Sequence, residues 1–336
     1  MKQPKQLLLI CAFFLLCYCK QNSSRDADSA EAYNEIVANS SDRDWKSIKK
    51  EGVLRALVVY SSTSYFLYKG QAMGFEYEML QQLAKDLDLE LELVISDNLD
   101  NQFEVLNRGD VDLIAHGMTV TNQRKWEVAF TEYLYLTKQV LVQKKPDNFR
   151  RLSWKSLHNA LIHDPIELIN DTVSIRRNSA YHERLISLSN EIGGTIHIDT
   201  LDSKLSTGEI MNMVADGNIK YTIADENLAR INASSRPILD ISVPISFSQR
   251  IAWVTRKKSK EFRKRINEWI VSQRKTKHYN VVYNKYFKNK RSFRRRTKSD
   301  YYSLKNNQIS AYDDLIKTYA NTSHCHSSYL CSCEYQ

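Results

Sequence analysis

The chain has 336 residues, 42% of them hydrophobic, and a formal net charge of +9. This length and composition predict a globular protein with one large or two modest domains. All 6 cysteines lie near the two ends of the chain, which excludes a disulfide framework for the folded part.

The first residues have the layout of a secretory signal. A basic start is followed by an apolar run, Leu7 to Leu16, that is too short to span a bilayer comfortably, and then by cysteines. A cysteine that ends such a leader resembles a bacterial lipoprotein signal, with residues 1–19 as the signal and Cys19 as the lipidated residue. Tyr18 is larger than the usual preceding residue, so an ordinary cleaved signal stays open. Polar residues 20–45 predict a flexible tether.

The following segments alternate between strand and helix. Residues 52–62 predict a buried strand, and residues 75–87 carry apolar side chains at helical spacing. Residues 89–95 alternate like a strand, a short helix ends near Gly109, and residues 111–117 predict the next strand. This order predicts an α/β domain with a largely parallel sheet.

The pattern then restarts in a second α/β lobe. Residues 138–145 and 248–258 read as long strands at the entry and exit of that lobe, so we expect the chain to cross between lobes twice. The prediction is lobe 1 over 46–138 plus 246–290, lobe 2 over 139–245, and a ligand cleft between them. The strand and helix units of lobe 2 are 152–162, 171–198 and 207–232.

Positive charge gathers toward the C-terminal end. Residues 256–298 hold 18 Lys and Arg against 2 acidic residues, so the rest of the chain is net acidic. Helices are predicted over 260–275 and 280–290, followed by a basic linker over 291–308. Such charge suits lipid headgroups or an anionic wall polymer, and a solvated helix face explains it as well. We expect no nucleic-acid partner for an exported protein.

Four ordered stretches carry a family resemblance. Over roughly residues 46–290 the chain resembles the extracellular solute-binding proteins of the polar amino-acid type, family 3. The resemblance implies an α/β, two-lobed periplasmic-binding-protein fold of type II, a periplasmic location, an amino-acid or peptide ligand in the cleft, and no cofactor or metal. The stretches are GFEYEMLQQLAKDL, LNRGDVDLIAHGMTVTNQRKWEVAFTEYLY, TVSIRRNSAYHERL and KYTIADENLARI.

The continuation YNKYFKNKRSFRRRTKSDYYSLKNNQISAYDDLIKTYA is similar to the junction in membrane-bound lytic murein transglycosylases of the F type, where a lysozyme-like catalytic domain follows. Residues 309–336 are then the truncated start of that domain. Glu334 is the sole acid of the last 16 residues and has no apolar helix before it, so no catalytic residue is assigned.

A metal site formed by the histidines and cysteines of this tail stays an alternative, although no second structured half of the chain is expected to enclose the metal. The histidines and cysteines in question are His324, Cys325, His326, Cys331 and Cys333.

Three functions follow from the resemblance. The first is a regulatory outer-membrane lipoprotein that binds an amino acid or a murein stem peptide. Such a protein would contact the membrane through its N-terminal lipid, and its surface would contact peptidoglycan. The second is an active peptidoglycan lytic transglycosylase. The third is the amino-acid receptor of an importer.

The resemblance also implies ligand-binding residues in lobe 1. The Arg of the family's TxTxxR pattern grips the ligand α-carboxylate, which places Arg124, Thr119 and Gly117 in that role. Tyr60 and Tyr65 occupy the region where the family places an aromatic against the ligand side chain. A surface ion pair for Arg124 and core positions for the tyrosines are the plainer interpretations. His116 departs from the family, which usually has a small residue there.

Lobe 2 is expected to supply the remaining contacts. Asp225, at the end of a predicted strand, carries over as the partner of the ligand ammonium, with a helix N-cap as the alternative. Asn178 and Ser179 lie where a strand turns into a helix, so their backbone N–H groups are expected to face an anion. A plain N-cap is the alternative for Ser179.

Overall fold

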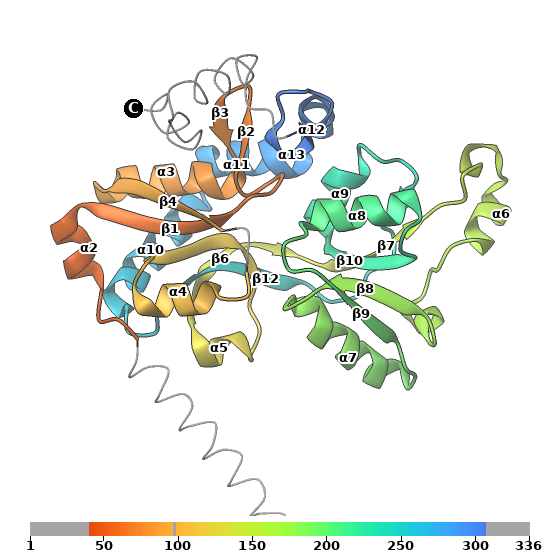
Figure 1. Cartoon of the computed structure of the whole chain (residues 1–336), viewed down its shortest axis with the longest axis horizontal. Helices are drawn as coiled ribbons and strands as arrows, with labels where there is room; N and C mark the ends of the chain where they lie inside the picture. Colours follow the sequence, from red (N-terminus) through yellow and green to blue (C-terminus); the bar gives the residue numbers. More distant parts are fainter. Residues whose placement is uncertain (1–39, 97–98, 307–336) are drawn as a thin grey trace, which may run out of the picture.

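The computed structural model describes residues 40–96 and 99–306. Two five-stranded sheets, each flanked by helices, form two lobes that lie side by side along the longest axis (Figure 1). The two-lobed α/β architecture expected from the sequence is confirmed. Within these described ranges, no helix is both long and apolar enough to cross a membrane.

The sheet of lobe 1 mixes parallel and antiparallel neighbours. Its order is β4-β1-β5-β12-β6, with β1 parallel to β4 and β5, and β12 antiparallel to β5 and β6. Strand β12 follows lobe 2 along the chain, so the chain returns to lobe 1 there and β12 pairs between β5 and β6. The strands are β1 (Val53–Val59), β4 (Glu90–Ser96), β5 (Leu113–Thr119), β6 (Ala129–Thr137) and β12 (Gln249–Thr255), with a small hairpin of β2 (Phe66–Tyr68) and β3 (Gln71–Met73).

Helix α3 (Phe75–Leu87) shows how the pattern of apolar residues builds the core of lobe 1. Phe75, Met79 and Leu83 recur at helical spacing and are buried in the largest hydrophobic cluster. The helix begins after Gly74, whose φ of 147° suits glycine alone. The other helices of this lobe are α2 (Trp45–Glu51), α4 (Gln102–Arg108), α5 (Arg124–Glu127), α10 (Lys260–Gln273), α11 (Lys277–Tyr283) and the π-helical turn η3 (Asn284–Lys288).

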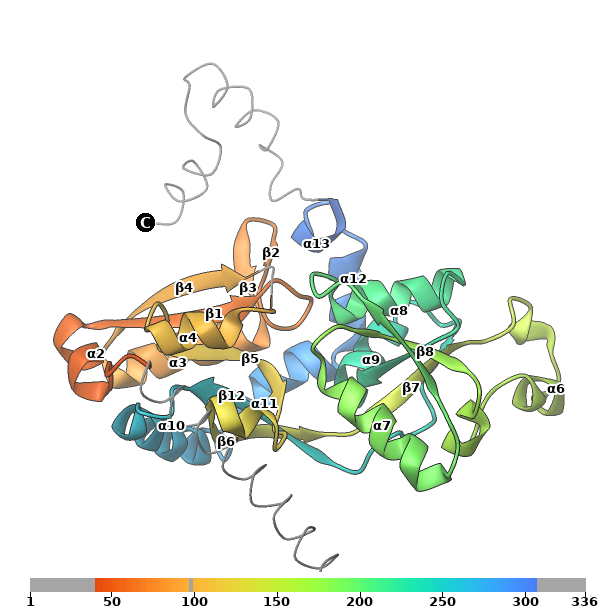
Figure 2. The same cartoon turned by 60° about the horizontal axis from the view of Figure 1, so that its bottom comes forward.

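Lobe 2 has a sheet with helices on both faces. Along β7, Leu141 belongs to the apolar cluster with α7, whereas Val140 and Val142 belong to the cluster with α8 and α9, because successive strand side chains point to opposite faces. Figure 2 shows α8 and α9 on one side of this sheet and α7 on the other. The strands, in sheet order, are β11 (Leu239–Asp240), β7 (Gln139–Lys144), β10 (Tyr221–Asp225), β8 (Thr172–Arg176) and β9 (His197–Leu201). The helices are η1 (Phe149–Arg151), α6 (Trp154–Asn159), η2 (Pro165–Leu168), α7 (Ala180–Ile192), α8 (Thr207–Asp216) and α9 (Glu226–Ala233).

The segment expected as a basic linker, 291–308, folds onto lobe 1 as far as the structure describes it. Helices α12 (Lys290–Thr297) and α13 (Ser303–Asn306) pack beside the β2–β3 hairpin. Phe293 and Tyr302 are buried, and the Arg296 guanidinium lies over three aromatic rings. The linker prediction was wrong here because these few aromatic contacts outweigh the basic composition.

The tether predicted over 20–45 also ends earlier than expected. Arg43 donates to buried Asp112 (Nε to Oδ1, 2.7 Å), and Arg256 Nη2 reaches the same oxygen at 3.0 Å. The Asp44 carboxylate accepts from the first N–H groups of α2 and α10. The predictions for residues 1–19, Cys19 and the tail 309–336, Glu334 included, lie outside the described residues.

Candidate functional site

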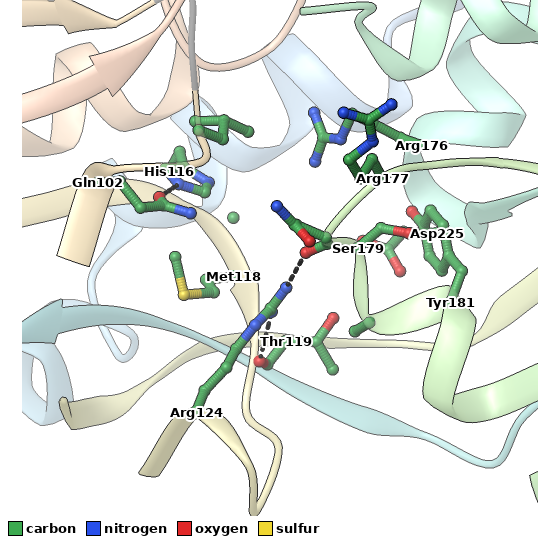
Figure 3. Close-up of a pocket in the computed structure, with 14 residues that line it drawn as sticks. Gln102, His116, Met118, Thr119, Arg124, Arg176, Arg177, Ser179, Tyr181 and Asp225 are labelled. Carbon is green, nitrogen blue, oxygen red and sulfur yellow. Dashed lines mark hydrogen bonds between the residues drawn. The ribbon is translucent and has the colours of Figure 1, made fainter. Parts of the chain in front are cut away.

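A polar pocket lies where the two lobes face each other. The space between its walls measures about 450 Å³ when the part open to solvent is included. Lobe 1 contributes the end of β5 and the start of α5, and lobe 2 contributes the β8–α7 turn and the end of β10 (Figure 3). The lining residues are Leu99, Gln102, His116, Gly117, Met118, Thr119, Arg124, Arg176, Arg177, Asn178, Ser179, Ala180, Tyr181 and Asp225.

Arg124 opens α5 and points across the pocket toward lobe 2. Its Nη1 donates to the Thr119 carbonyl at 3.0 Å, and its Nη2 donates to the Asn178 carbonyl of the opposite lobe at 3.2 Å. Burial, and then the nearby Arg176, lower the pKa of Arg124. Among the described residues it forms no ion pair with an acid. The side chain is therefore held by carbonyls, with its charge directed at the pocket.

Asp225 ends β10 on the opposite wall and is 7% exposed. Its Oδ1 is buried without a hydrogen-bond partner in the described part of the chain, and the side chain does not cap α9 although it stands at the N-cap position. Burial raises the pKa of Asp225 to about 7, while Arg176 and Arg124 act in the opposite direction. A buried acceptor without a donor is costly, so this position favours a ligand that brings one.

The turn before α7 presents polar groups to the same space. Ser179 Oγ is buried, makes no hydrogen bond within the described ranges and does not cap α7. Asn178 adopts φ of 57°, and its Nδ2 donates to Asp100 Oδ1 of lobe 1 at 2.6 Å. Ser203 of lobe 2 donates to the other oxygen of Asp100 at 2.9 Å. These contacts form a clasp of Asp100, Asn178 and Ser203 between the lobes.

His116 and Gly117 shape the wall formed by β5. His116 is 7% exposed, and its Nε2 lies 2.7 Å from Gln102 Oε1. Burial and the two arginines lower the pKa of His116 to about 3, so the ring is neutral at physiological pH. A Cβ on Gly117 would lie 2.8 Å from the Tyr135 hydroxyl, which explains why glycine occupies this point.

The structure brings six of the eight predicted binding residues to the pocket and leaves two outside it. Tyr60 and Tyr65 pack against each other with ring centroids 6.4 Å apart, beside the β2–β3 hairpin. Sequence reasoning missed Arg176 and Tyr181, which line the pocket from lobe 2. The signal for Arg176 was present as the RR pair at a strand end, directly before the predicted anion-facing turn. No group of three potential metal ligands occurs in the described part of the chain.

Comparisons with known proteins agree with this architecture. The description "Bacterial extracellular solute-binding proteins, family 3" matches residues 57–289. The membrane-bound lytic murein transglycosylase F of Desulfosudis oleivorans is 31% identical over 243 residues, which are 72% of this chain and 50% of that protein. The enzyme of the same name from Pseudomonas savastanoi is 28% identical over 212 residues, covering 62% of this chain and 39% of its own. The chain thus spans about half or less of the curated relatives it matches.

Solved structures share the fold. The P235GK mutant of ArgBP from T. maritima has a TM-score of 0.58 at 24% identity and covers 72% of this chain and 98% of its own. The L-arginine-bound amino acid ABC transporter substrate-binding protein AbpA of Streptococcus pneumoniae has a TM-score of 0.58 at 19% identity, covering 73% and 99%. These likenesses confirm the type II periplasmic-binding-protein fold.

Proposed function

Since the chain belongs to the bacterial extracellular solute-binding proteins of family 3, we propose that it binds a small amino acid between its lobes through Arg124 and Asp225. One observation carries the proposal. A partly covered arginine on one lobe and, on the other, a buried carboxyl oxygen without a partner among the described residues face a single pocket. A zwitterion, whose carboxylate and ammonium are joined through one carbon, offers a partner to each of these two groups.

The ligand carboxylate would bind at the Arg124 side. A guanidinium offers donors in a planar fork, and two of those of Arg124 are bound to carbonyls, which leaves others for the ligand. Ser179 Oγ and the N-terminal end of α7 add uncharged donors in the same space. The ammonium would donate to Asp225 Oδ1, which supplies the missing partner of that atom.

Binding of this kind couples to closure of the lobes. The clasp and the bond from Arg124 to the Asn178 carbonyl exist only when the lobes are together. A zwitterion held by Arg124 and Asp225 adds contacts to the closed form alone, so it shifts the population toward that form.

The curated relatives suggest where in the cell this binding takes place and which process it serves. We propose an envelope lipoprotein, anchored through Cys19 in the outer membrane, that regulates murein cleavage in response to an amino acid or a murein stem peptide and contacts peptidoglycan. The names of the curated relatives, all membrane-bound lytic murein transglycosylases, support this setting. No residue of the pocket is proposed to be catalytic.

The first test is calorimetry of the full mature chain with L-glutamate, L-glutamine, L-alanine and L-arginine. We expect Arg124→Ala to weaken binding of every ligand that the parent binds by at least about 30-fold, because a buried charged contact is worth roughly 2–5 kcal/mol. Arg151→Ala removes an exposed arginine of lobe 2 and should leave binding unchanged. Equal affinity of the parent and Arg124→Ala, or no binding of any of the four, would refute the proposal.

A further inference from the structure

The charges of the pocket do not balance. Its lining holds the arginines 124, 176 and 177 against the single acid Asp225, and His116 is neutral. Arg177 is exposed to solvent, whereas Arg124 and Arg176 are partly covered. A zwitterion with one carboxylate would pair with Arg124 and Asp225 and leave the second covered arginine without an anion.

Arg176 is that second arginine. It is the last residue of β8, and its side chain makes no hydrogen bond or ion pair with any described residue. The positive charge of Arg176 lowers the pKa of the nearby Arg124. Asp225 does not come within ion-pair distance of Arg176. Figure 3 shows Arg176 and Asp225 on the lobe 2 side of the pocket, opposite Arg124.

An uncompensated covered cation is costly unless an anion arrives with the ligand. Burial lowers the pKa of Arg176, as expected for a cation that is partly withdrawn from water. The groups that act on its charge are Tyr181, Asp225 and Asp100. Asp225 is already assigned to the ligand ammonium, and Asp100 accepts hydrogen bonds from Asn178 and Ser203. A second negative group on the ligand would supply the partner that Arg176 lacks among the described residues.

We infer that the pocket selects an amino acid with a second carboxylate, and that Arg176 is the residue that binds this side-chain carboxylate. The inference rests on the proposed function and specifies its ligand. Counting Arg124, Arg176 and Asp225, the site has a net charge of +1 before binding. A dicarboxylic amino acid brings −1 and neutralises it, a neutral amino acid leaves it unchanged, and a basic one raises it to +2. The order of affinity is acidic, then neutral, then basic.

The test compares ligands of equal shape and different charge. Calorimetry of the full mature chain with L-glutamate against L-glutamine, and L-aspartate against L-asparagine, needs no variant. We expect the acidic member of at least one pair to bind about 30-fold more tightly or better, as one charge-assisted contact in a covered site provides. Equal binding within both pairs in the parent protein overturns the inference and leaves the proposed function standing, whereas no binding of any amino acid removes both.

Variants then assign the preference to a residue. Arg176→Gln should lower glutamate affinity to that of glutamine and change glutamine affinity less than about threefold, while Arg176→Lys should keep part of the preference. Arg151→Gln, outside the pocket, should keep the parent ratio. A parallel loss of both ligands in Arg176→Gln, with a native circular dichroism spectrum, contradicts direct binding by Arg176. A preference lost in Arg177→Gln instead moves the assignment to that neighbour and overturns the role of Arg176.

Discussion

Asp225 should make ligand affinity depend on pH near neutrality. Burial raises the pKa of Asp225 to about 7 in the ligand-free protein, and only the ionised carboxylate can pair with the ligand ammonium. Below pH 7 the protein must therefore release a proton to bind. Each pH unit below 7 lowers the affinity about tenfold, which is about 1.4 kcal/mol. At pH 5 the affinity should be about 100-fold below its plateau above pH 8.

Calorimetry with L-glutamine from pH 5 to 8.5 measures this slope, because that ligand has no titrating side chain. Repeating the titrations in buffers of different ionisation enthalpy counts the released protons, which should approach one below pH 6. Asp225→Asn should bind more weakly at pH 8 and show no slope. Asp147→Asn, which changes an exposed aspartate of lobe 2, should keep the parent slope.

Two results would contradict this reasoning. One is a parent affinity that stays flat between pH 5 and 8, which would mean that Asp225 is ionised throughout or does not meet the ammonium. The other is a slope that persists in Asp225→Asn, which would assign the proton to another group. His116 cannot supply it, because its pKa is lowered to about 3. If glutamine does not bind measurably, L-glutamate serves as the probe above pH 6, where its side chain stays ionised.

Three further predictions concern closure and stability. Asp100→Ala removes the lobe 1 side of the clasp, and small-angle scattering with saturating ligand should show a smaller fraction of compact protein than in the parent; identical profiles would exclude a role in closure. Burial raises the pKa of Glu76 from 4.5 to about 8, so this group should lower the stability by about 3 kcal/mol as pH rises from 4.5 toward 7. Urea unfolding of Glu76→Gln should lose this share and keep the share of Asp225, whose pKa is also raised; an unchanged slope would refute the role of Glu76. Asp112→Ala leaves the fully buried Arg256 without its acid and should cost about 3–5 kcal/mol in the same assay, whereas a loss under 1 kcal/mol would contradict the charge network.

Local sequence pattern was sufficient for the elements and their alternation. The apolar stripe of α3 that begins at Phe75 is one face of a helix wherever that helix packs, so spacing alone predicts it. Strand β7 is apolar on both faces, through Leu141 on one and Val140 on the other, as expected for a strand covered on both sides. Arg124 at the start of α5 and Asp225 at the end of β10 could be proposed as site residues because their motifs resemble a known family.

Composition was misleading where a few specific contacts decide the fold. Residues 291–308 are strongly basic and were predicted to be a linker, yet Phe293 and Tyr302 are buried and Arg296 lies over aromatic rings. Some of these contacts join segments more than 200 residues apart, as does the hydrogen bond that the Leu67 N–H donates to Ser303 Oγ. No local window of sequence contains both partners of such a contact.

Only the tertiary structure decided which charges share one space. The sequence places Arg176 at the end of a predicted strand. That Arg176 has no partner among the described residues becomes visible only when both lobes are placed around the pocket. The clasp at Asp100 likewise depends on two loops of lobe 2 meeting one of lobe 1. Periodicity reports which face of an element is buried, because burial follows the local repeat of the backbone. Electrostatic balance depends on distances between elements remote in sequence, so the excess positive charge of this site appears only in the folded protein.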